Sequence, residues 1–317
     1  MEKYKRYKAV VIGCGRIGAE EWSYPENIKP ATHAGAYWAN SKTKLVGLCD
    51  INPQRLKEAG RIFSGVPTYS SVKKMLEETR PDIVSIATHP DSHYRFVKMA
   101  ANFGVRAIVC EKPISDSLKK AEMMVSICKE KGSFLFIGHL RHFDPLTRKY
   151  QGILRNGTLG EDLRVNCSYY NGFFNNGTHV VDLLRWFLGD IKRVSGCYNL
   201  KTSNPKKDKN IDAVLYFTNK SCATLSSLAE KKGRTEWVFY GKKGELSIKK
   251  LGMEIKYNNL KVGRPRSLMA AMILHITACL DGKEKPLSTG QDGLAVLKIL
   301  FAVKKSADRK REVALMA

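Results

Sequence analysis

Three glycines near the start of the chain, Gly13, Gly15 and Gly18, stand at a spacing that can hold the phosphates of a dinucleotide. The apolar run before them (AVVI) is typical of a buried strand, and a helix is expected to follow. In such a turn the first glycine permits the bend, the second lets the backbone approach a pyrophosphate, and the third lets the helix lie close to the strand. The positive end of the helix dipole then favours the phosphates. We therefore expect this turn, with Arg16 and Ile17 inside it, to bind a cofactor.

Asp50 follows a second apolar run at residues 45–49. A carboxylate at the end of this strand can accept hydrogen bonds from the ribose hydroxyls of adenosine and repels a 2′-phosphate, so the sequence favours NAD over NADP. Residues 20–30 (EEWSYPENIKP) lengthen the spacing between the glycines and Asp50. Because this segment holds two prolines and shows no helical period, we expect it to form a surface loop.

Lys112 stands in the tripeptide Glu111-Lys112-Pro113, directly after a predicted strand at residues 106–110. A lysine at the carboxyl end of a strand can lose part of its proton affinity through burial and neighbouring positive charge. It can then exchange a proton with a substrate hydroxyl. Pro113 restricts the backbone, and the peptide bond before it can be cis. An exposed lysine in a turn is the competing interpretation of the tripeptide alone.

Thr88, His89 and His93 follow a further predicted buried strand at residues 82–87. Open α/β sheets bind ligands beyond the carboxyl ends of their strands, so we expect this polar loop to flank the nicotinamide. The two histidines are four residues apart, but no carboxylate or cysteine set completes a metal site around them. No metal is therefore expected.

His179 is the second candidate for proton transfer. It stands near the start of a predicted helix, beside the apolar stripe Val180, Leu183, Leu184 and Phe187. The dipole at a helix N-terminus disfavours the imidazolium, which leaves a neutral ring able to accept a proton. Taken alone, the residue also fits an ordinary core or surface histidine.

The elements that must position these residues divide the chain of 317 residues into two domains. Up to Gly138, strand runs alternate with helical segments, which requires parallel strands joined by right-handed crossovers. Beyond it, strands follow one another, with hairpin signals at residues 218–220 and 241–244. We predict an α/β chain: a Rossmann doubly wound parallel sheet over residues 1–138, and an α+β domain with a largely antiparallel, open-faced sheet over residues 139–317.

The composition, with 43% hydrophobic and 26% charged residues, is that of an ordinary globular protein. No apolar stretch approaches the roughly 18 residues that span a bilayer, and the N-terminus does not read as a signal peptide. We therefore expect a cytoplasmic protein with no membrane partner. Eight cysteines without a C-x-x-C pair are expected to be reduced. The net charge is +24, but its basic residues form scattered doublets, so we expect a solvated surface and no nucleic-acid partner.

Taken in order, the glycine turn, Asp50, the strand at residues 81–86 and the Glu111-Lys112-Pro113 tripeptide resemble the glucose-fructose oxidoreductase / inositol dehydrogenase / MocA (Gfo/Idh/MocA) family. The resemblance continues along nearly the whole chain. Residues 138–145 (GHLRHFDP) look like the domain junction of that family, and residues 175–182 (NNGTHVVD) look like its catalytic helix.

The resemblance implies an NAD(P)-dependent oxidoreductase that transfers a hydride between the nicotinamide and a secondary alcohol or ketone carbon of a sugar, polyol or nucleotide sugar. It implies that Lys112 and His179 are catalytic and contact the substrate, and that Arg141 and Asn175 contact the substrate or the nicotinamide. Glu111, Lys112 and Pro113 are expected to line the cofactor site. Many relatives carry an aspartate where this chain has Asn175. Because an amide cannot take up a proton, that departure leaves the base role to His179, assisted by Lys112. The basic surface slightly favours an anionic or nucleotide-linked sugar.

In related proteins the free face of the second sheet joins subunits, which implies a homodimer or homotetramer. The alternative function is a regulatory protein of the same fold that binds NAD and a sugar without turnover. The presence of both Lys112 and His179 argues against that alternative, because a protein without turnover needs no groups for proton transfer. The catalytic interpretation requires these two groups to converge on one nicotinamide ring.

Overall fold

A computed structural model describes residues 6–24, 26–202, 208–229, 236–249, 254–257, 260–261 and 267–315. The chain forms two compact units. The first comprises Met1–Asp144 and Arg266–Leu294, and the second comprises Pro145–Pro265 and Ala295–Ala317.

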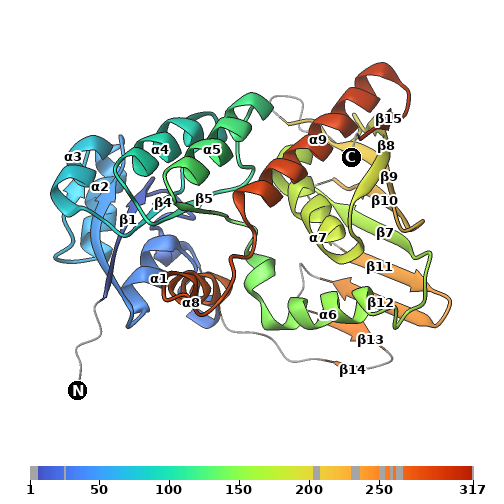
Figure 1. Ribbon diagram of the computed structural model, residues 1–317, viewed down its shortest axis with the longest axis horizontal. Coiled ribbons are helices and arrows are strands. Elements are labelled where there is room, and N and C mark those ends of the chain that lie inside the picture. Colours follow the sequence, from blue (N-terminus) through green and yellow to red (C-terminus); the bar gives the residue numbers. More distant parts are fainter. Residues whose placement is uncertain are drawn as a thin grey trace. The chain divides into compact units, whose positions relative to one another are not determined.

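The first unit is built on a six-stranded parallel sheet in the order β3-β2-β1-β4-β5-β6 (Figure 1). The order reverses between β1 and β4, which is the topology of a dinucleotide-binding doubly wound sheet. The residues of β4 and β5 are all buried, because helices cover both faces of a parallel sheet, and Ser85 is the one strongly polar residue among them. The strands are β1 (Tyr7–Ile12), β2 (Thr43–Cys49), β3 (Thr68–Tyr69), β4 (Ile83–Ile86), β5 (Ala107–Cys110) and β6 (Phe134–Ile137).

Helices cover both faces of this sheet. On one face α1 lies beside α8, and α4 and α5 lie on the other (Figure 1). The helices are α1 (His33–Ala39), α2 (Pro53–Ile62), α3 (Val72–Thr79), α4 (Pro90–Asn102), α5 (Leu118–Glu130) and α8 (Leu268–Leu280). Short turns of 3-10 helix are η1 (Glu21–Ser23), η2 (Glu26–Ile28) and η3 (Leu140–Phe143).

The first unit includes a late segment of the chain that the sequence placed in the second domain. Met269, Met272, Ile273 and Ile276 of α8 are buried in the same core as Tyr37 of α1. The apolar faces of α1 and α8 cover each other, and this packing brings the later segment of the chain back to the first unit. The unit therefore contains an early segment, Met1–Asp144, and a later one, Arg266–Leu294, whereas the sequence indicated one continuous domain.

The second unit is built on a nine-stranded sheet in the order β14-β13-β12-β11-β7-β10-β9-β8-β15. Among its described strands β7 and β10 pair in parallel, and the other neighbours pair antiparallel. The strands are β7 (Arg164–Tyr169), β8 (Ile191–Tyr198), β9 (Ile211–Phe217), β10 (Cys222–Ser227), β11 (Glu236–Gly241), β12 (Gly244–Lys249), β13 (Glu254–Tyr257), β14 (Leu260–Lys261) and β15 (Val313–Ala314). The predicted largely antiparallel sheet is confirmed, and β13 to β15 are additional to the predicted strands.

One face of this sheet is packed and the other is open. Phe187 of α7 makes an edge-to-face contact with Phe239 of β11 at a ring separation of 5.8 Å. On the opposite face, Arg164, Asn166 and Thr224 are exposed, in alternation with buried neighbours. The helical elements are α6 (Pro145–Arg155), the π-helix η4 (Phe173–Gly177), α7 (Thr178–Leu188) and α9 (Gly290–Arg309), which belongs to this unit from Ala295 on.

Candidate functional site

The glycine turn at the end of β1 combines two tightly packed glycines with one that has only the guanidinium of an exposed arginine near it. Gly13 has a φ of +94°, and a Cβ there would lie 2.5 Å from the carbonyl oxygen of Ala87. A Cβ at Gly18 would lie 1.9 Å from the carbonyl oxygen of Gly13. At Gly15 the nearest atom to such a Cβ is 3.7 Å away, in the guanidinium of Arg55. The backbone at Gly15 is therefore open to a ligand, and this fits the close approach of a dinucleotide pyrophosphate.

Asp50 closes the same turn from the end of β2. Its Oδ2 accepts a hydrogen bond from the backbone N–H of Cys14 at 2.7 Å, and its Oδ1 accepts one from Asn52 at 2.8 Å. The side chain is buried, yet each carboxylate oxygen retains acceptor capacity for a ribose hydroxyl. Burial, together with the Asp50 charge, raises the pKa of the Cys14 thiol to about 12, so this cysteine is a neutral packing residue.

Arg55 is a residue of this site that the sequence analysis did not single out. It is exposed on α2, whose first turn is capped by the side chain of Asn52, and its guanidinium is the group nearest to Gly15. A guanidinium offers several N–H donors to an anion. Its place in the first helical turn after Asp50 is the signal that could have identified it.

Residues 20–32 leave the helix that begins at the glycine turn and then return to it. The backbone N–H of His33 donates to the carbonyl oxygen of Ile17 at 3.1 Å, and that of Ala34 donates to Gly18 at 2.9 Å. In an uninterrupted helix these oxygens would accept from residues four positions later in the chain. The segment is therefore an excursion inserted into one helix, whose hydrogen bonding resumes beyond it.

Internal contacts hold the excursion in place. The carboxylate of Glu21 accepts hydrogen bonds from the backbone N–H groups of Ala31 at 3.1 Å and Thr32 at 3.0 Å. The guanidinium of Arg16, in the glycine turn, lies 5.7 Å from the ring centre of Tyr24, close enough for a cation–π contact. The sequence indicated a loop without helical period, but the segment contains the two 3-10 turns η1 and η2.

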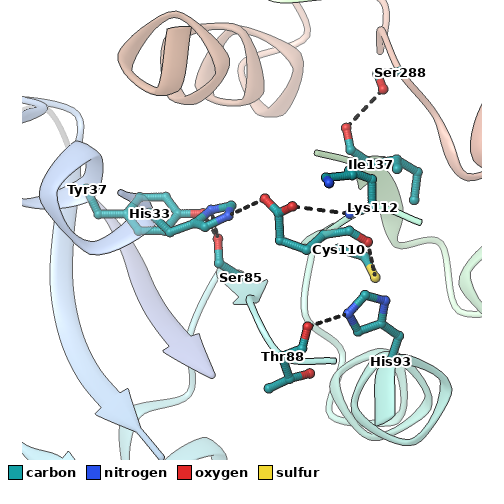
Figure 2. Close-up of polar contacts among 10 residues, drawn as sticks. His33, Tyr37, Ser85, Thr88, His93, Cys110, Lys112, Ile137 and Ser288 are labelled. Carbon is teal, nitrogen blue, oxygen red and sulfur yellow. Dashed lines mark hydrogen bonds and ion pairs between the residues drawn. The ribbon is translucent and has the colours of Figure 1, made fainter. Parts of the chain in front are cut away.

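β5 delivers Glu111-Lys112-Pro113 to the carboxyl edge of the sheet. Oε1 of Glu111 lies 3.1 Å from Nε2 of His33, and Oε2 accepts a hydrogen bond from the backbone N–H of Lys112 at 3.2 Å (Figure 2). Burial acts to raise the pKa of Glu111, but the hydrogen bond from His33 and the positive charge of Lys112 hold it below its ordinary value. Lys112 is half-buried, and the peptide bond between Lys112 and Pro113 is cis.

Behind Glu111 lies a chain of buried polar groups from two other elements. Oγ of Ser85, in β4, lies 3.0 Å from Nδ1 of His33 and 2.8 Å from the hydroxyl of Tyr37, in α1 (Figure 2). These three side chains were not singled out from the sequence. The excursion hides the spacing between the glycines and His33, whereas Ser85 is visible as the one polar residue in the strand sequence IVSI.

The polar loop after β4 has an exposed part and a buried part. His89 is exposed at the start of α4, and Oγ1 of Thr88 lies 2.7 Å from Oγ of Ser92. His93 is fully buried, with its ring nitrogens 3.1 Å from the carbonyl oxygens of Thr88 and Ile114. Burial lowers the pKa of His93. His93 therefore ties the loop after β4 to the segment that follows Pro113.

His179 is the second residue of α7 in the second unit, and it is half-buried. Just before this helix, the carboxylate of Asp208 accepts hydrogen bonds from the backbone N–H groups of Phe174 at 3.1 Å and Asn175 at 2.8 Å. Nδ2 of Asn175 donates to the carbonyl oxygen of Asn171 at 3.1 Å. Asp208 was not predicted, because it stands in a charged stretch that gives no sign of its long-range contact.

The first unit thus places the predicted cofactor residues along the carboxyl edges of four neighbouring strands. They are Gly13, Gly15, Arg16, Ile17 and Gly18 after β1, Asp50 after β2, Thr88, His89 and His93 after β4, and Glu111, Lys112 and Pro113 after β5. Arg141 lies in η3 after β6, and it is half-buried. His179 and Asn175 belong to the second unit.

Within the described ranges no group of three or more His, Cys, Asp or Glu side chains is arranged to hold a metal ion. In the same part of the chain, each helix is too short or too polar to cross a bilayer.

Comparison with known proteins gives a consistent assignment for both halves of the chain. Residues 7–139 match the family profile described as "Oxidoreductase family, NAD-binding Rossmann fold", and residues 147–247 match the "GFO/IDH/MocA C-terminal domain". The chain is 25% identical to the D-apiose dehydrogenase of Paraburkholderia graminis, over 98% of this chain and 90% of the relative. It is 24% identical to the myo-inositol 2-dehydrogenase of Thermotoga maritima, over 96% and 97%.

Solved structures show the same fold. The WlbA dehydrogenase of Bordetella pertussis, solved with NADH and UDP-GlcNAcA, gives a TM-score of 0.84 at 22% identity and covers 99% of this chain and 100% of its own. An oxidoreductase from Agrobacterium radiobacter, solved with NAD+, L-tartaric acid and magnesium, gives 0.82 at 20% identity, with 98% of each chain covered.

Proposed function

The chain belongs to the GFO/IDH/MocA family of NAD-binding oxidoreductases, and on that premise we propose that it transfers a hydride between NAD and a secondary alcohol or ketone carbon of a sugar, polyol or nucleotide sugar. One observation carries the proposal. Lys112 stands at the carboxyl end of β5, on the same sheet edge as the open backbone of Gly15 and the carboxylate of Asp50.

The cofactor in this proposal is NAD in preference to NADP. When bound, its nicotinamide supplies the acceptor or donor of the hydride. The glycine turn would hold the pyrophosphate, and Asp50 would accept from the ribose hydroxyls and repel a 2′-phosphate. His93 acts from behind the site, because its ring nitrogens face backbone carbonyl oxygens and fix the loop that carries Thr88 and His89.

Lys112 and His179 manage the proton of the substrate hydroxyl in the proposed reaction. A neutral imidazole can take up that proton, and the lysine side chain can donate to the same oxygen or accept from it. Asn175 can orient a substrate hydroxyl but cannot act as a base. The Asp208 carboxylate holds the backbone at Asn175 and so supports its position. Arg141 is proposed as a further substrate contact.

The substrate class is proposed from the relatives and from the charge of the chain. D-Apiose and myo-inositol, in the names of two relatives, are polyhydroxy compounds. The net charge of +24 favours an anionic or nucleotide-linked member of this class. We further propose a homodimer or homotetramer that forms through the open face of the second sheet. A cytoplasmic location is consistent with eight free cysteines.

A substrate panel tests the proposal. The protein is incubated with NAD+ and, separately, with NADP+ in the presence of inositols, aldoses and nucleotide sugars, and reduced cofactor is followed by absorbance. We expect NADH formation with at least one class, and slower reaction with NADP+. Tight NAD binding without reduction across the whole panel would contradict the proposal and would favour the regulatory alternative.

A further inference from the structure

We propose that His33 is a positioning residue for Lys112, acting through the Glu111 carboxylate as the link in a buried chain that runs back to Ser85 and Tyr37. The inference rests on the proposed function, because it assigns Lys112 a part in the reaction. It adds residues that stand outside the predicted catalytic and cofactor sets.

The chain of contacts is continuous. The hydroxyl of Tyr37 lies 2.8 Å from Oγ of Ser85, which lies 3.0 Å from Nδ1 of His33. Nε2 of His33 lies 3.1 Å from Oε1 of Glu111, and Oε2 of Glu111 accepts from the backbone N–H of Lys112 at 3.2 Å (Figure 2). Tyr37, Ser85 and His33 are fully buried, so water does not compete for these contacts.

One arrangement of protons satisfies every group in the chain. A carboxylate only accepts, so the proton of the His33 ring belongs on Nε2, where it faces Glu111. Nδ1 then accepts from the hydroxyl of Ser85, and Oγ of Ser85 accepts from the hydroxyl of Tyr37. Burial raises the pKa of Tyr37, which keeps that hydroxyl a donor. Each hydroxyl or ring N–H therefore donates to the next group along the chain, and the Glu111 carboxylate is the last acceptor.

The Glu111 carboxylate is also confined by the backbone of Gly138. A Cβ added at Gly138 would lie 2.7 Å from Oε1, so the backbone of Gly138 passes close to the carboxylate. With His33 on one oxygen and the Lys112 N–H on the other, the carboxylate has a fixed orientation. Because that orientation sets where the backbone of Lys112 lies, removal of the Nε2 donor is expected to release the segment that carries the amine.

The excursion explains how His33 reaches this place. Its backbone N–H bonds to the carbonyl oxygen of Ile17, so the helix resumes one turn beyond the glycine turn with His33 as its first residue. The same helix that begins at the cofactor-binding turn therefore contributes the donor that holds Glu111. Cofactor binding and lysine placement share one structural support.

The test compares His33→Leu, which removes the donor, with His33→Gln, whose side-chain amide can place an N–H near the position of Nε2. In His33→Leu we expect kcat to fall about 100-fold, with KM and the Kd for NADH changed less than about threefold. The kcat of His33→Gln is expected to be at least about a tenth of the wild-type kcat. Tyr37→Phe, which removes only the terminal hydroxyl, is expected to lower kcat by about threefold.

A second buried histidine provides the matched control. His275, in α8, lies with Nδ1 2.5 Å from Oε2 of Glu284, and its Nε2 accepts a hydrogen bond from the backbone N–H of Leu287 at 3.1 Å. His275→Gln is expected to lower stability while kcat stays at the wild-type value. A general effect of disturbing a buried histidine that contacts a glutamate would instead lower kcat in both His33→Leu and His275→Gln, and would overturn the proposal.

Hydrogen exchange provides a readout that does not need a substrate. The amide of Lys112, which donates to Glu111, is expected to exchange at least about tenfold faster in His33→Leu and at the wild-type rate in His275→Gln. Unchanged exchange in His33→Leu together with a kcat within twofold of wild type would overturn the proposal.

If His33→Leu does not fold, wild-type values of kcat and of Lys112 amide exchange in Tyr37→Phe would overturn the proposal. If the wild type reduces no cofactor, the proposed function fails, and exchange at Lys112 alone decides the positioning claim.

Discussion

A 2.7 Å hydrogen bond joins Cys14 to Asp50: the backbone N–H inside the glycine turn donates to Oδ2 of the carboxylate. The bond fixes the carboxylate beside the turn, where it would meet the 2′ position of a bound adenosine ribose. Replacement of Asp50 by Ser removes the negative charge, so the preference for NAD over NADP, as the ratio of kcat/KM, is expected to fall by about tenfold or more. Steady-state kinetics with both cofactors measure it.

Asp82 provides the control for this variant, because its Oδ2 likewise accepts a backbone N–H, from Lys8 at 2.8 Å. Asp82→Asn is expected to lower stability without altering the cofactor ratio. An unchanged ratio in Asp50→Ser would show that this carboxylate does not select the cofactor.

Substitution by alanine is predicted to lower the stability of the protein at Gly18 but not at Gly15. At Gly18 a Cβ would collide with the carbonyl oxygen of Gly13 at 1.9 Å, so Gly18→Ala is expected to lower the free energy of unfolding by about 1–3 kcal/mol. At Gly15 the nearest atom would be 3.7 Å away, so Gly15→Ala is expected to change that free energy by less than about 0.5 kcal/mol.

The same Gly15→Ala variant is expected to weaken NADH binding by about tenfold or more, because the methyl group occupies space that the pyrophosphate would need. Urea unfolding and NADH fluorescence titration separate the two effects. Wild-type NADH affinity in a folded Gly15→Ala protein would mean that the open backbone is not the phosphate site.

The excursion is predicted to be removable. Because His33 and Ala34 already donate to the carbonyl oxygens of Ile17 and Gly18, deletion of residues 20–31 would join Ala19 to Thr32 within a continuous helix. We expect a folded protein with an unfolding transition like that of the wild type in circular dichroism. NADH binding is expected to weaken, because Arg16 loses its contact with Tyr24. Aggregation of the deletion variant would show that the helix does not close without the excursion.

The lowered pKa of Glu111 predicts that the protein loses the stabilising contribution of this carboxylate in acid. Its native pKa is lowered from 4.5, so its contribution to the free energy of unfolding is present above pH 4.5 and is lost as the pH falls through the native value. The difference in unfolding free energy between the wild type and Glu111→Gln is therefore expected to shrink as the pH falls below 4.5. Urea titrations from about pH 7 to about pH 3 measure it. A difference that grows in acid would contradict the lowered pKa.

The first sheet was predictable because its strands are nearly continuous apolar runs that end in glycine or polar residues. β4 and β5 are buried on both faces and read clearly in the sequence. The packing of α8 was not predictable. Its apolar residues show that it is buried, but the sequence holds no local signal for which core it joins. The parallel pairing of β7 with β10 is hidden for the same reason, because hairpin signals report only neighbouring strands.

The candidate site divides in the same way. Gly13, Asp50 and Lys112 follow apolar runs directly, so strand ends locate them. His33 makes its contact with Glu111 across 78 positions of sequence, and the excursion separates it from the glycine turn that it supports. Asp208 is likewise joined to Asn175 across 33 positions. Such long-range contacts depend on the tertiary path of the chain, which local sequence patterns do not encode.

The most direct test of the account is the turnover of Lys112→Met and His179→Gln with the best substrate from the panel, alongside the exposed Lys119→Met as control. We predict that each of the two loses about 10²–10⁴ in kcat while its Kd for NADH stays within about threefold of wild type, and that Lys119→Met keeps both values. Near-normal turnover in Lys112→Met and in His179→Gln would contradict the assignment of proton transfer to these residues.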